Sequence, residues 1–390
     1  MQGDREAERG RWAVAAMFLI NGFIMGAWAP QIPLMLPRHQ ITESTLGLLI
    51  LTLGIGAVGA MLFAGRMIAR IGSRRMVMLF GWLSTLVLPA VVLAPNLWVL
   101  PVALVAFGGI VGCMDVSMNA NAVAVERRLN RAIMSSSHGF WSLGGFVGGA
   151  IGALALARWG APAQAIGVGV ICAGIMALAL PHLLQDGPVV APKAEGPVVK
   201  EPLLPRDGAL WLLGFMTLFS MVPEGAVLDW AAIYLNKELG AGLTVAGMGF
   251  ALFSGMMAVM RFLGDAVRNR FGAVKTLRYS GYIGAAGLLL MAVAPSPVLV
   301  IAGCALAGIG VANMVPILFS AAGNHPGMTP GAGIATVTML GYSGILFAPG
   351  TIGVIAEHTG FRATYLALGL ILLAVAVLAG RAAAADRIGH

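Results

Sequence analysis

The sequence has few charged residues and few cysteines, and both shortages restrict its class. Only 10% of its 390 residues are charged and 59% are hydrophobic, with a mean hydropathy of +0.89. A soluble chain averages about 25% charged residues, so this composition indicates a membrane protein. The three cysteines, Cys113, Cys172 and Cys304, each lie in an apolar stretch. That setting favours reduced, buried thiols over a disulfide framework or a metal site.

Motifs for ATP use and for hydrolysis are also missing. None of the four lysines completes the phosphate-binding pattern Gly-x-x-x-x-Gly-Lys-Ser/Thr, which argues against primary pumping driven by ATP on this chain. Neither His-Glu-x-x-His nor Gly-x-Ser-x-Gly occurs, so hydrolase chemistry lacks its usual parts. We therefore expect no enzymatic activity, no cofactor and no bound metal.

Long apolar segments are what the sequence has in abundance. A membrane-spanning helix needs about 20 mostly apolar residues, and segments of that length recur along the chain. They predict an all-α, multi-pass membrane protein with about twelve transmembrane helices. The expected spans are 12–36, 44–68, 76–94, 97–124, 132–157, 161–184, 209–236, 243–267, 274–294, 297–322, 331–356 and 361–381.

Lysine and arginine are distributed unevenly among the ends of these spans. With the N-terminus placed inside, 20 of the 24 fall in cytoplasmic segments, Arg261 among them. Because basic residues are retained on the cytoplasmic side, this bias predicts that the N- and C-termini are both cytoplasmic. It also explains the pI of about 9.9 without a nucleic-acid partner.

The two halves of the chain repeat at a constant offset of 200 residues. Matched pairs include Arg70 with Arg270, Gly72 with Gly272, Pro95 with Pro295 and Gly160 with Gly360. Between them the apolar pattern gives way to spaced prolines and charges, which is typical of an extended linker. We predict an N-terminal six-helix bundle over 1–185, a cytoplasmic linker over 186–208 and a C-terminal six-helix bundle over 209–390. A repeat of this kind predicts a solute site between the bundles.

Three polar residues stand in the apolar surroundings of residues 112–141. Asp115 and Asn119 are four apart and share one helix face. If the next helix returns antiparallel, His138 comes back to the depth of Asn119. A carboxyl group shielded from water binds a proton more readily, and an imidazole titrates near neutrality, so Asp115 and His138 are candidates for proton coupling. The alternative is that these residues hold helices together, with Asn119 either a structural or a solute contact.

A second acidic site lies in the seventh expected span. Pro223 and Gly225 flank Glu224, which predicts a broken helix of the kind that lines transporter sites. We expect Glu224 to take part in proton coupling and solute binding. Asp229 is a further solute-binding candidate, and its alternative is a place at the outer membrane interface beside Trp230 and Tyr234.

Uncharged polar and aromatic side chains complete the set of solute-binding candidates. Hydroxylated solutes such as sugars are typically held by amides and carboxylates, with aromatic rings stacking on the solute. The candidates are Asn21, Trp141, Asn313 and Tyr342. For each of them the alternative is ordinary helix packing.

The loop after the second span resembles the signature of the major facilitator superfamily, Gly-x-x-x-Asp-Arg-x-Gly-Arg-Arg. The matching positions are Gly65, Arg70, Gly72, Arg74 and Arg75. The resemblance implies a cytoplasmic gate, but Ala69 replaces the aspartate that latches the gate in the family. Glu126, on the facing loop, is a candidate partner for Arg70 or Arg74. In the second half, Asp265 and Arg270 belong to the corresponding gate segment.

Two further runs narrow the resemblance within the superfamily. The His-Gly-Phe-Trp-Ser run at 138–142 and the Pro-Glu-Gly-x-x-x-Asp-Trp run at 223–230 are similar to a bacterial inner-membrane branch grouped with fucose-permease-like carriers. The resemblance implies a secondary transporter of the bacterial inner membrane that moves a small polar, sugar-like solute by alternating access, coupled to protons. We expect a monomer whose partners are the solute, protons and the lipid bilayer.

The alternative is a proton-driven exporter of drugs or metabolites. Drug antiporters of the superfamily carry Gly-x-x-x-Gly-Pro-x-x-Gly-Gly in their fifth helix. Residues 144–152 keep the glycines of that pattern but lack its proline, which weighs against export.

Overall fold

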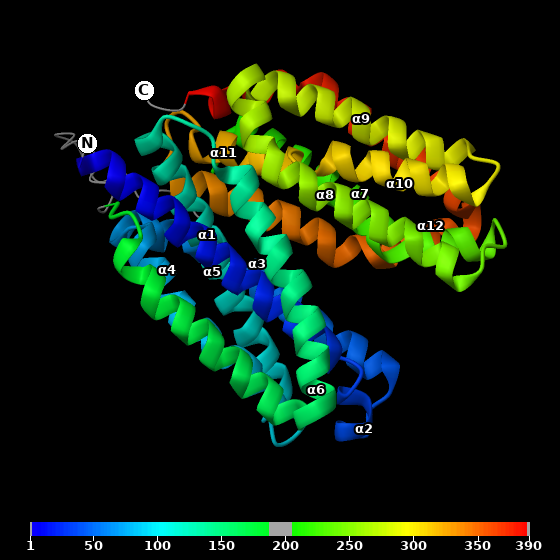
Figure 1. Cartoon of the computed structure of the whole chain (residues 1–390), viewed down its shortest axis with the longest axis horizontal. Helices are drawn as coiled ribbons and strands as arrows, with labels where there is room; N and C mark the ends of the chain where they lie inside the picture. The colour runs from blue at the N-terminus through cyan, green and yellow to red at the C-terminus, as the bar shows by residue number, and fades with distance from the viewer. Residues whose placement is uncertain (1, 187–204, 388–390) are drawn as a thin grey trace. The chain divides into compact units, whose positions relative to one another are not determined.

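The computed structural model describes residues 2–186 and 205–387, and every regular element within these ranges is a helix (Figure 1). The first half contains α1 (Gln2–Trp28), η1 (Ala29–Gln31), α2 (Met35–His39), α3 (Glu43–Ile71), α4 (Ser73–Val92), α5 (Val99–Leu129), α6 (Met134–Ala179) and η2 (Leu180–His182). The second half contains α7 (Gly208–Lys237), α8 (Leu243–Phe271), α9 (Ala273–Val293), α10 (Pro297–Val311), α11 (Met314–Gly323), α12 (Pro330–Val377) and η3 (Leu378–Asp386). Most of the predicted linker, residues 187–204, lies outside the described residues.

The helices have the length and composition of membrane spans. Within the described residues, nine are long and apolar enough to cross a membrane, and the two longest, of 49 and 57 residues, contain α6 and α12. Each of these two has a non-helical glycine, Gly160 or Gly360, at which the chain turns (Figure 1). Once these turns are counted, the nine helices account for eleven of the twelve predicted spans. The remaining predicted span, 274–294, corresponds to α9, which is helical but is not among the nine. The all-α membrane fold is confirmed, and the orientation of the termini stays a prediction.

The helices group into two compact units. The first comprises Met1–Arg206 with Gly327–Met339, so it includes the start of α12; the second comprises Asp207–Pro326 and Leu340–Ile388. In the first unit α1 packs on α6, and α3 and α4 pack on α5. In the second unit α10 packs on α8 and α9, and α7 packs on α8 and α11.

Glycines allow backbone-to-backbone contact between α1 and α6. A Cβ atom on Gly144 would lie 2.1 Å from the carbonyl oxygen of Leu19, and one on Gly22 would lie 2.0 Å from that of Trp141. Real side chains cannot occupy such positions, so small residues are required for this close helix approach. The contact places Asn21 of α1 beside Trp141 of α6.

The position of the broken helix differs from the prediction. The helix around Glu224 runs without interruption, since Pro223 lies inside α7. The break falls instead between α10 and α11, at Ala312 and Asn313. Pro316 accounts for it, because a proline lacks the N–H that would bond to the carbonyl of residue 312 and its ring clashes with that carbonyl. Pro223 removes one backbone hydrogen bond from α7 without breaking the helix. Membrane helices commonly accommodate such a proline, because nearby groups satisfy the carbonyl that it frees.

The 200-residue repeat extends to the backbone and to helix capping. Gly72 and Gly272 adopt nearly the same conformation, with φ 85° and 84°, between consecutive helices. Asp186 accepts hydrogen bonds from the first two N–H groups of α4, at 3.1 and 3.0 Å. Asp386 does the same for α9, at 2.5 and 3.4 Å. Each aspartate satisfies otherwise unbonded N–H groups at a helix start and lies at the positive end of its dipole.

Candidate functional site

The first unit contains a buried cluster of polar groups on α5 and α6. His138 Nε2 lies 3.2 Å from Asn119 Oδ1, and Asn119 Nδ2 donates to the carbonyl oxygen of Asp115 at 2.9 Å. Asp115 is only 3% exposed and Asn119 is fully buried. The ring of Phe18 packs 5.0 Å from the imidazole. The predicted return of His138 to the depth of Asn119 is therefore confirmed, and the cluster links an imidazole to the helix turn that carries a carboxyl group.

A second contact in the same unit joins two of the predicted solute ligands. Trp141 Nε1 donates to Asn21 Oδ1 at 2.9 Å, and Asn21 Nδ2 donates to the carbonyl oxygen of Val111 at 3.2 Å. These bonds connect α1, α5 and α6. Because Asn21 is 1% exposed and both ends of its amide are bonded inside the protein, it orients Trp141, whereas the half-buried indole is the better placed of the two for a solute.

The second unit holds an ion pair inside its helices. Arg261 Nη2 lies 3.2 Å from both carboxylate oxygens of Glu224, and the two side chains are only 6% and 18% exposed. Arg261 lies on α8, ten residues before its end at Phe271, or about 15 Å along the helix axis. Arg261 was counted with a cytoplasmic segment, but it lies inside α8 with its side chain buried against Glu224. Its spacing from Asp265 and Arg268 was the available signal, because residues four and seven apart share one helix face.

Asn313 lies at the break between α10 and α11 and is also buried. It is 1% exposed, and its carboxamide packs so closely on α8 that a Cβ atom on Gly264 would lie 1.9 Å from Asn313 Oδ1. Neither Oδ1 nor Nδ2 of this side chain has a hydrogen-bond partner among the described residues. Buried amides are normally satisfied, so this one has unused capacity to bind a polar group.

The predicted gate residues have local structural roles in the first unit. A Cβ atom on Gly65 would lie 2.9 Å from the Cα atom of Ala332, which explains a glycine where α3 meets the start of α12. Glu126 is fully buried, and its Oε1 accepts from the N–H groups of Ile133 and Met134 at the start of α6. The pairing of Glu126 with Arg70 or Arg74 stays a prediction, as do the roles of Arg75, Asp265 and Arg270.

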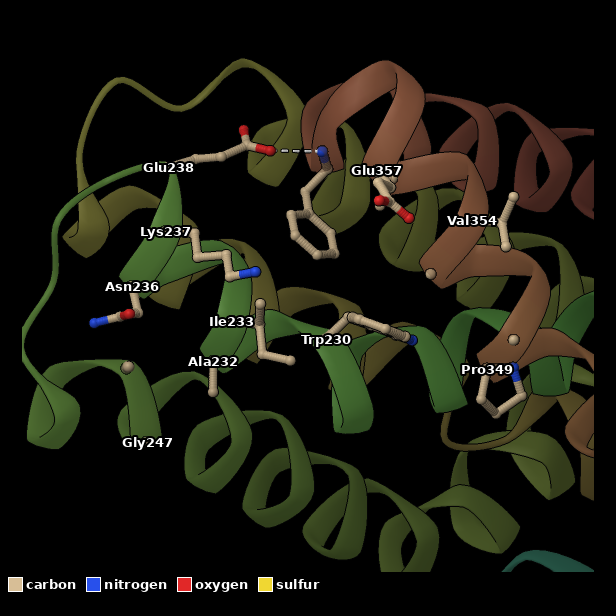
Figure 2. A pocket seen from close by; sticks show the side chains of 15 residues that line it. Trp230, Ala232, Ile233, Asn236, Lys237, Glu238, Gly247, Pro349, Val354 and Glu357 are labelled. Atoms are coloured by element: carbon tan, nitrogen blue, oxygen red, sulfur yellow. Dashed lines mark hydrogen bonds between the residues drawn. The ribbon is translucent and has the colours of Figure 1, made fainter. Parts of the chain in front are cut away.

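A cavity of about 1220 Å³ opens in the second unit, at the C-terminal end of α7 (Figure 2). Its walls come from α7, the start of α8 and the middle of α12, and Trp230 and Lys237 face α12 across it. Glu238 closes one edge, because its Oε1 accepts from the N–H of Phe361 at 2.6 Å. Neither Glu224 nor any other candidate from the sequence lines this cavity.

The remaining candidates lie apart from these clusters. Asp229 is exposed on α7, next to the cavity residue Trp230. Tyr234 is fully buried and donates its hydroxyl to the carbonyl oxygen of Met291 at 2.7 Å. The alternative place of Asp229 at the outer membrane interface stays a prediction. Tyr342 is half-buried on α12. Across residues 2–186 and 205–387 no group of three His, Cys, Asp or Glu side chains is arranged to hold a metal ion.

Comparison with known proteins identifies the family. The sequence matches the family model of the Major Facilitator Superfamily over residues 14–349 and 230–387. The chain belongs to this superfamily of transporters. A relative described as an uncharacterised MFS-type transporter, from Yersinia pestis, is 37% identical over 363 residues, covering 93% of each chain. The superfamily signature at 65–75 was therefore read correctly from the sequence.

Solved structures agree with this assignment. The fucose:proton symporter FucP of E. coli superposes with a TM-score of 0.77 at 15% identity, covering 95% of this chain and 97% of the symporter. The human organic anion transporter MFSD10 superposes with a TM-score of 0.73 at 16% identity, covering 96% and 99%. At these identities the likeness establishes the fold alone.

Proposed function

We propose that this superfamily member is a secondary active transporter that moves a small polar, sugar-like solute across the bacterial inner membrane by alternating access, coupled to protons. The observation that carries the proposal is the part-buried contact between His138 and Asn119, one helical turn from Asp115. Ionisable side chains inside apolar helices are costly, and they are typically retained where an ion or solute passes. FucP, which shares the fold, is described as a symporter of a sugar and protons.

The cluster suggests how a proton acts on the helices. Asn119 Oδ1 is a pure acceptor, so its contact with His138 Nε2 requires a proton on that nitrogen. Loss of this proton, with the remaining one on Nδ1, places two acceptors against each other and favours a different arrangement of the amide. Because Asn119 Nδ2 also bonds to the α5 backbone at Asp115, a proton leaving or arriving changes the contact between α5 and α6. Asp115 supplies the second titratable group of the path.

We further propose the arrangement expected from the repeat and the charge bias. The chain is a monomer with six-helix bundles over 1–185 and 209–390, a linker at 186–208, and both termini in the cytoplasm. Trp141, Asn119, Glu224 and Asn313 contribute to solute binding, and the gate residues at 65–75 act on the cytoplasmic side.

The test uses the purified full-length chain in liposomes. An imposed pH gradient, alkaline inside, is expected to drive concentrative uptake of at least one radiolabelled sugar or sugar derivative from a panel, and a protonophore is expected to abolish it. Uptake that is unaffected by the pH gradient for every solute would contradict proton coupling. Proton-driven movement of lipophilic cations alone, against the uptake direction, would replace the proposal with drug export.

A further inference from the structure

We infer that the transported solute is a hydroxylated carboxylic acid, whose carboxylate binds Arg261 when Glu224 takes up a proton. The inference rests on the proposed function and adds the charge of the solute to it. Arg261 carries the inference, because a guanidinium group buried within a membrane helix is costly and marks an ion or solute path.

Positive and negative charges are balanced along the buried face of α8. Arg261, Asp265 and Arg268 occupy this face at intervals of four and three residues, and all three are at most 7% exposed. With Glu224 on α7 they form a set of two positive and two negative groups. Arg268 Nη2 is committed to the hydroxyl of Ser320 at 2.7 Å and to the carbonyl oxygen of Ala385 at 2.6 Å. Arg261, in contrast, contacts the carboxylate of Glu224, whose charge a proton can remove.

Only one member of the Glu224–Arg261 pair can lose its charge. An arginine stays protonated under all physiological conditions, whereas a carboxylate becomes neutral when it binds a proton. Neutralising Glu224 leaves the region with one excess positive charge, and a buried charge without a counter-ion is strongly unfavourable. The group that restores the balance is an anion. Displacement of Arg261 by a cationic solute would instead require a permanent charge to leave its buried position.

The ionisable groups around Glu224 come from the elements packed against α7. They are Arg261, Asp265, Arg268 and Arg270 on α8, Cys304 on α10, Tyr342, Glu357, His358, Arg362 and Tyr365 on α12, and Arg381 and Asp386 on η3. Tyr365 donates its hydroxyl to the carbonyl oxygen of Ala226, and Asp386 caps α9. Arg261 is thus the permanent cation in contact with the Glu224 carboxylate.

The side chains around Arg261 bear on the rest of the solute. A guanidinium group matches the two oxygens of a carboxylate, which gives orientation as well as charge. Asn313 packs on Gly264, one turn along α8 from Arg261, with both of its polar atoms unused among the described residues. A carboxamide offers one acceptor and two donor hydrogens, which suits hydroxyl groups. One proton balances one carboxylate, whereas a phosphate monoester carries about 1.5 to 2 negative charges and leaves an excess.

The experiment compares glucose with derivatives of glucose that carry a carboxylate, an amine or a phosphate group. Thermal stabilisation of the purified full-length chain is measured at pH 5.5 and 7.5 with glucose, gluconate, glucuronate, glucosamine and glucose 6-phosphate. The two carboxylic acids are expected to stabilise the protein at pH 5.5 and much less at pH 7.5. Arg261→Gln is expected to remove this effect, Arg261→Lys to weaken it, and the matched control Lys275→Gln, at an exposed site on α9, to leave it unchanged.

Glu224→Gln gives a gain that cannot arise from misfolding. With the carboxylate replaced by a neutral amide, the negative charge at position 224 is absent at every pH, so the acids are expected to stabilise this variant equally at pH 5.5 and 7.5. Equal stabilisation by glucose, tighter binding of glucose 6-phosphate or glucosamine, or no effect of any acid at pH 5.5 would each overturn the inference. Concentrative, pH-driven uptake of a neutral sugar would overturn it while leaving the proposed function intact; acid binding without pH-driven uptake would contradict proton coupling instead.

Discussion

The two repeats of the chain share their turns and helix caps but differ in their buried polar groups. Gly160 and Gly360 turn the chain with φ of 80° and 83°, and Asp186 and Asp386 cap equivalent helices. The candidate site residues, in contrast, are not repeated. The residues 200 positions away from Asp115, Asn119, His138, Glu224, Arg261 and Asn313 are Val315, Phe319, Thr338, Ile24, Met61 and Cys113.

This difference separates what specifies the fold from what specifies the activity. Turns and caps are needed in both halves, because each half has to build the same type of helix packing. Buried ionisable groups are expensive, so each occurs in the half that uses it. The first unit holds an imidazole hydrogen-bonded to a neutral amide, whereas the second holds a full ion pair. We therefore expect the first unit to respond to protons alone, and the second to link a proton on Glu224 to the charge of the solute.

Removal of the carboxyl group in the first unit should have the largest effect. Asp115→Asn is expected to abolish accumulation against a gradient, since the variant lacks one titratable group of the path, while exchange of solute across the membrane persists. Counterflow and pH-driven uptake in liposomes measure the two activities separately. Glu6→Gln removes an exposed carboxyl group of the same unit and serves as the control. Undiminished uphill transport by Asp115→Asn would return Asp115 to a structural role.

The helix contacts of the two repeats should also differ in their tolerance of a methyl group. A Cβ atom on Gly144 meets the backbone oxygen of Leu19 at 2.1 Å, whereas one on the matched Gly344 meets the side chain of Leu218 at 2.9 Å. Backbone cannot move aside as a side chain can, so Gly144→Ala should destabilise the protein by about 1–3 kcal/mol or more. Gly344→Ala should cost much less, because a helical alanine recovers up to about 1 kcal/mol.

The melting temperature in detergent measures this contrast. Gly59→Ala is the control, since no atom lies within 4 Å of its added Cβ atom. Equal losses for Gly144→Ala and Gly344→Ala would mean that the packing of α1 on α6 is as adaptable as that of α7 on α12.

Much of the fold could be predicted because membrane helices leave a strong one-dimensional signal. A run of about 20 apolar residues has few alternatives to a spanning helix, and the ends of the predicted spans fall at both turns, Gly160 and Gly360. The break at Asn313 could not be placed, because Pro223 and Pro316 both interrupt apolar runs. The structure keeps the helix at Pro223 continuous and interrupts the one at Pro316. The packing of neighbouring helices decides between these outcomes, and the local sequence does not show it.

Only one member of the Glu224–Arg261 ion pair could be identified from the sequence, for a related reason. Glu224 stood out as a lone acid in an apolar run, but Arg261 was assigned to the nearest helix end. A count of basic residues cannot tell whether a side chain reaches water or a carboxylate 37 residues away in the sequence. His138 was found because it lies on the next helix after Asn119, where the antiparallel return fixes its depth.

A smaller effect is expected when the imidazole of the first unit loses its titration. His138→Gln retains a donor for Asn119 Oδ1 but cannot change its charge. Transport should continue with a flatter profile between about pH 5 and 8, the range in which histidine titrates. Initial uptake rates across that range measure the change, with the exposed His182→Gln as control. An unaltered profile would assign the pH response to Asp115 or Glu224.

The smallest effect is expected from removing the aspartate helix caps, which the two repeats share. Asp186→Ala and Asp386→Ala each remove the cap from two N–H groups, and loss of a helix cap typically costs about 0.5–2 kcal/mol. Since the two sites have no shared partners, the double variant should lose the sum of the single losses, as read from unfolding in detergent. A much larger loss at one site, or a loss of transport without one of stability, would show that this aspartate does more than cap its helix, and that the symmetry of the repeats ends at the backbone turns.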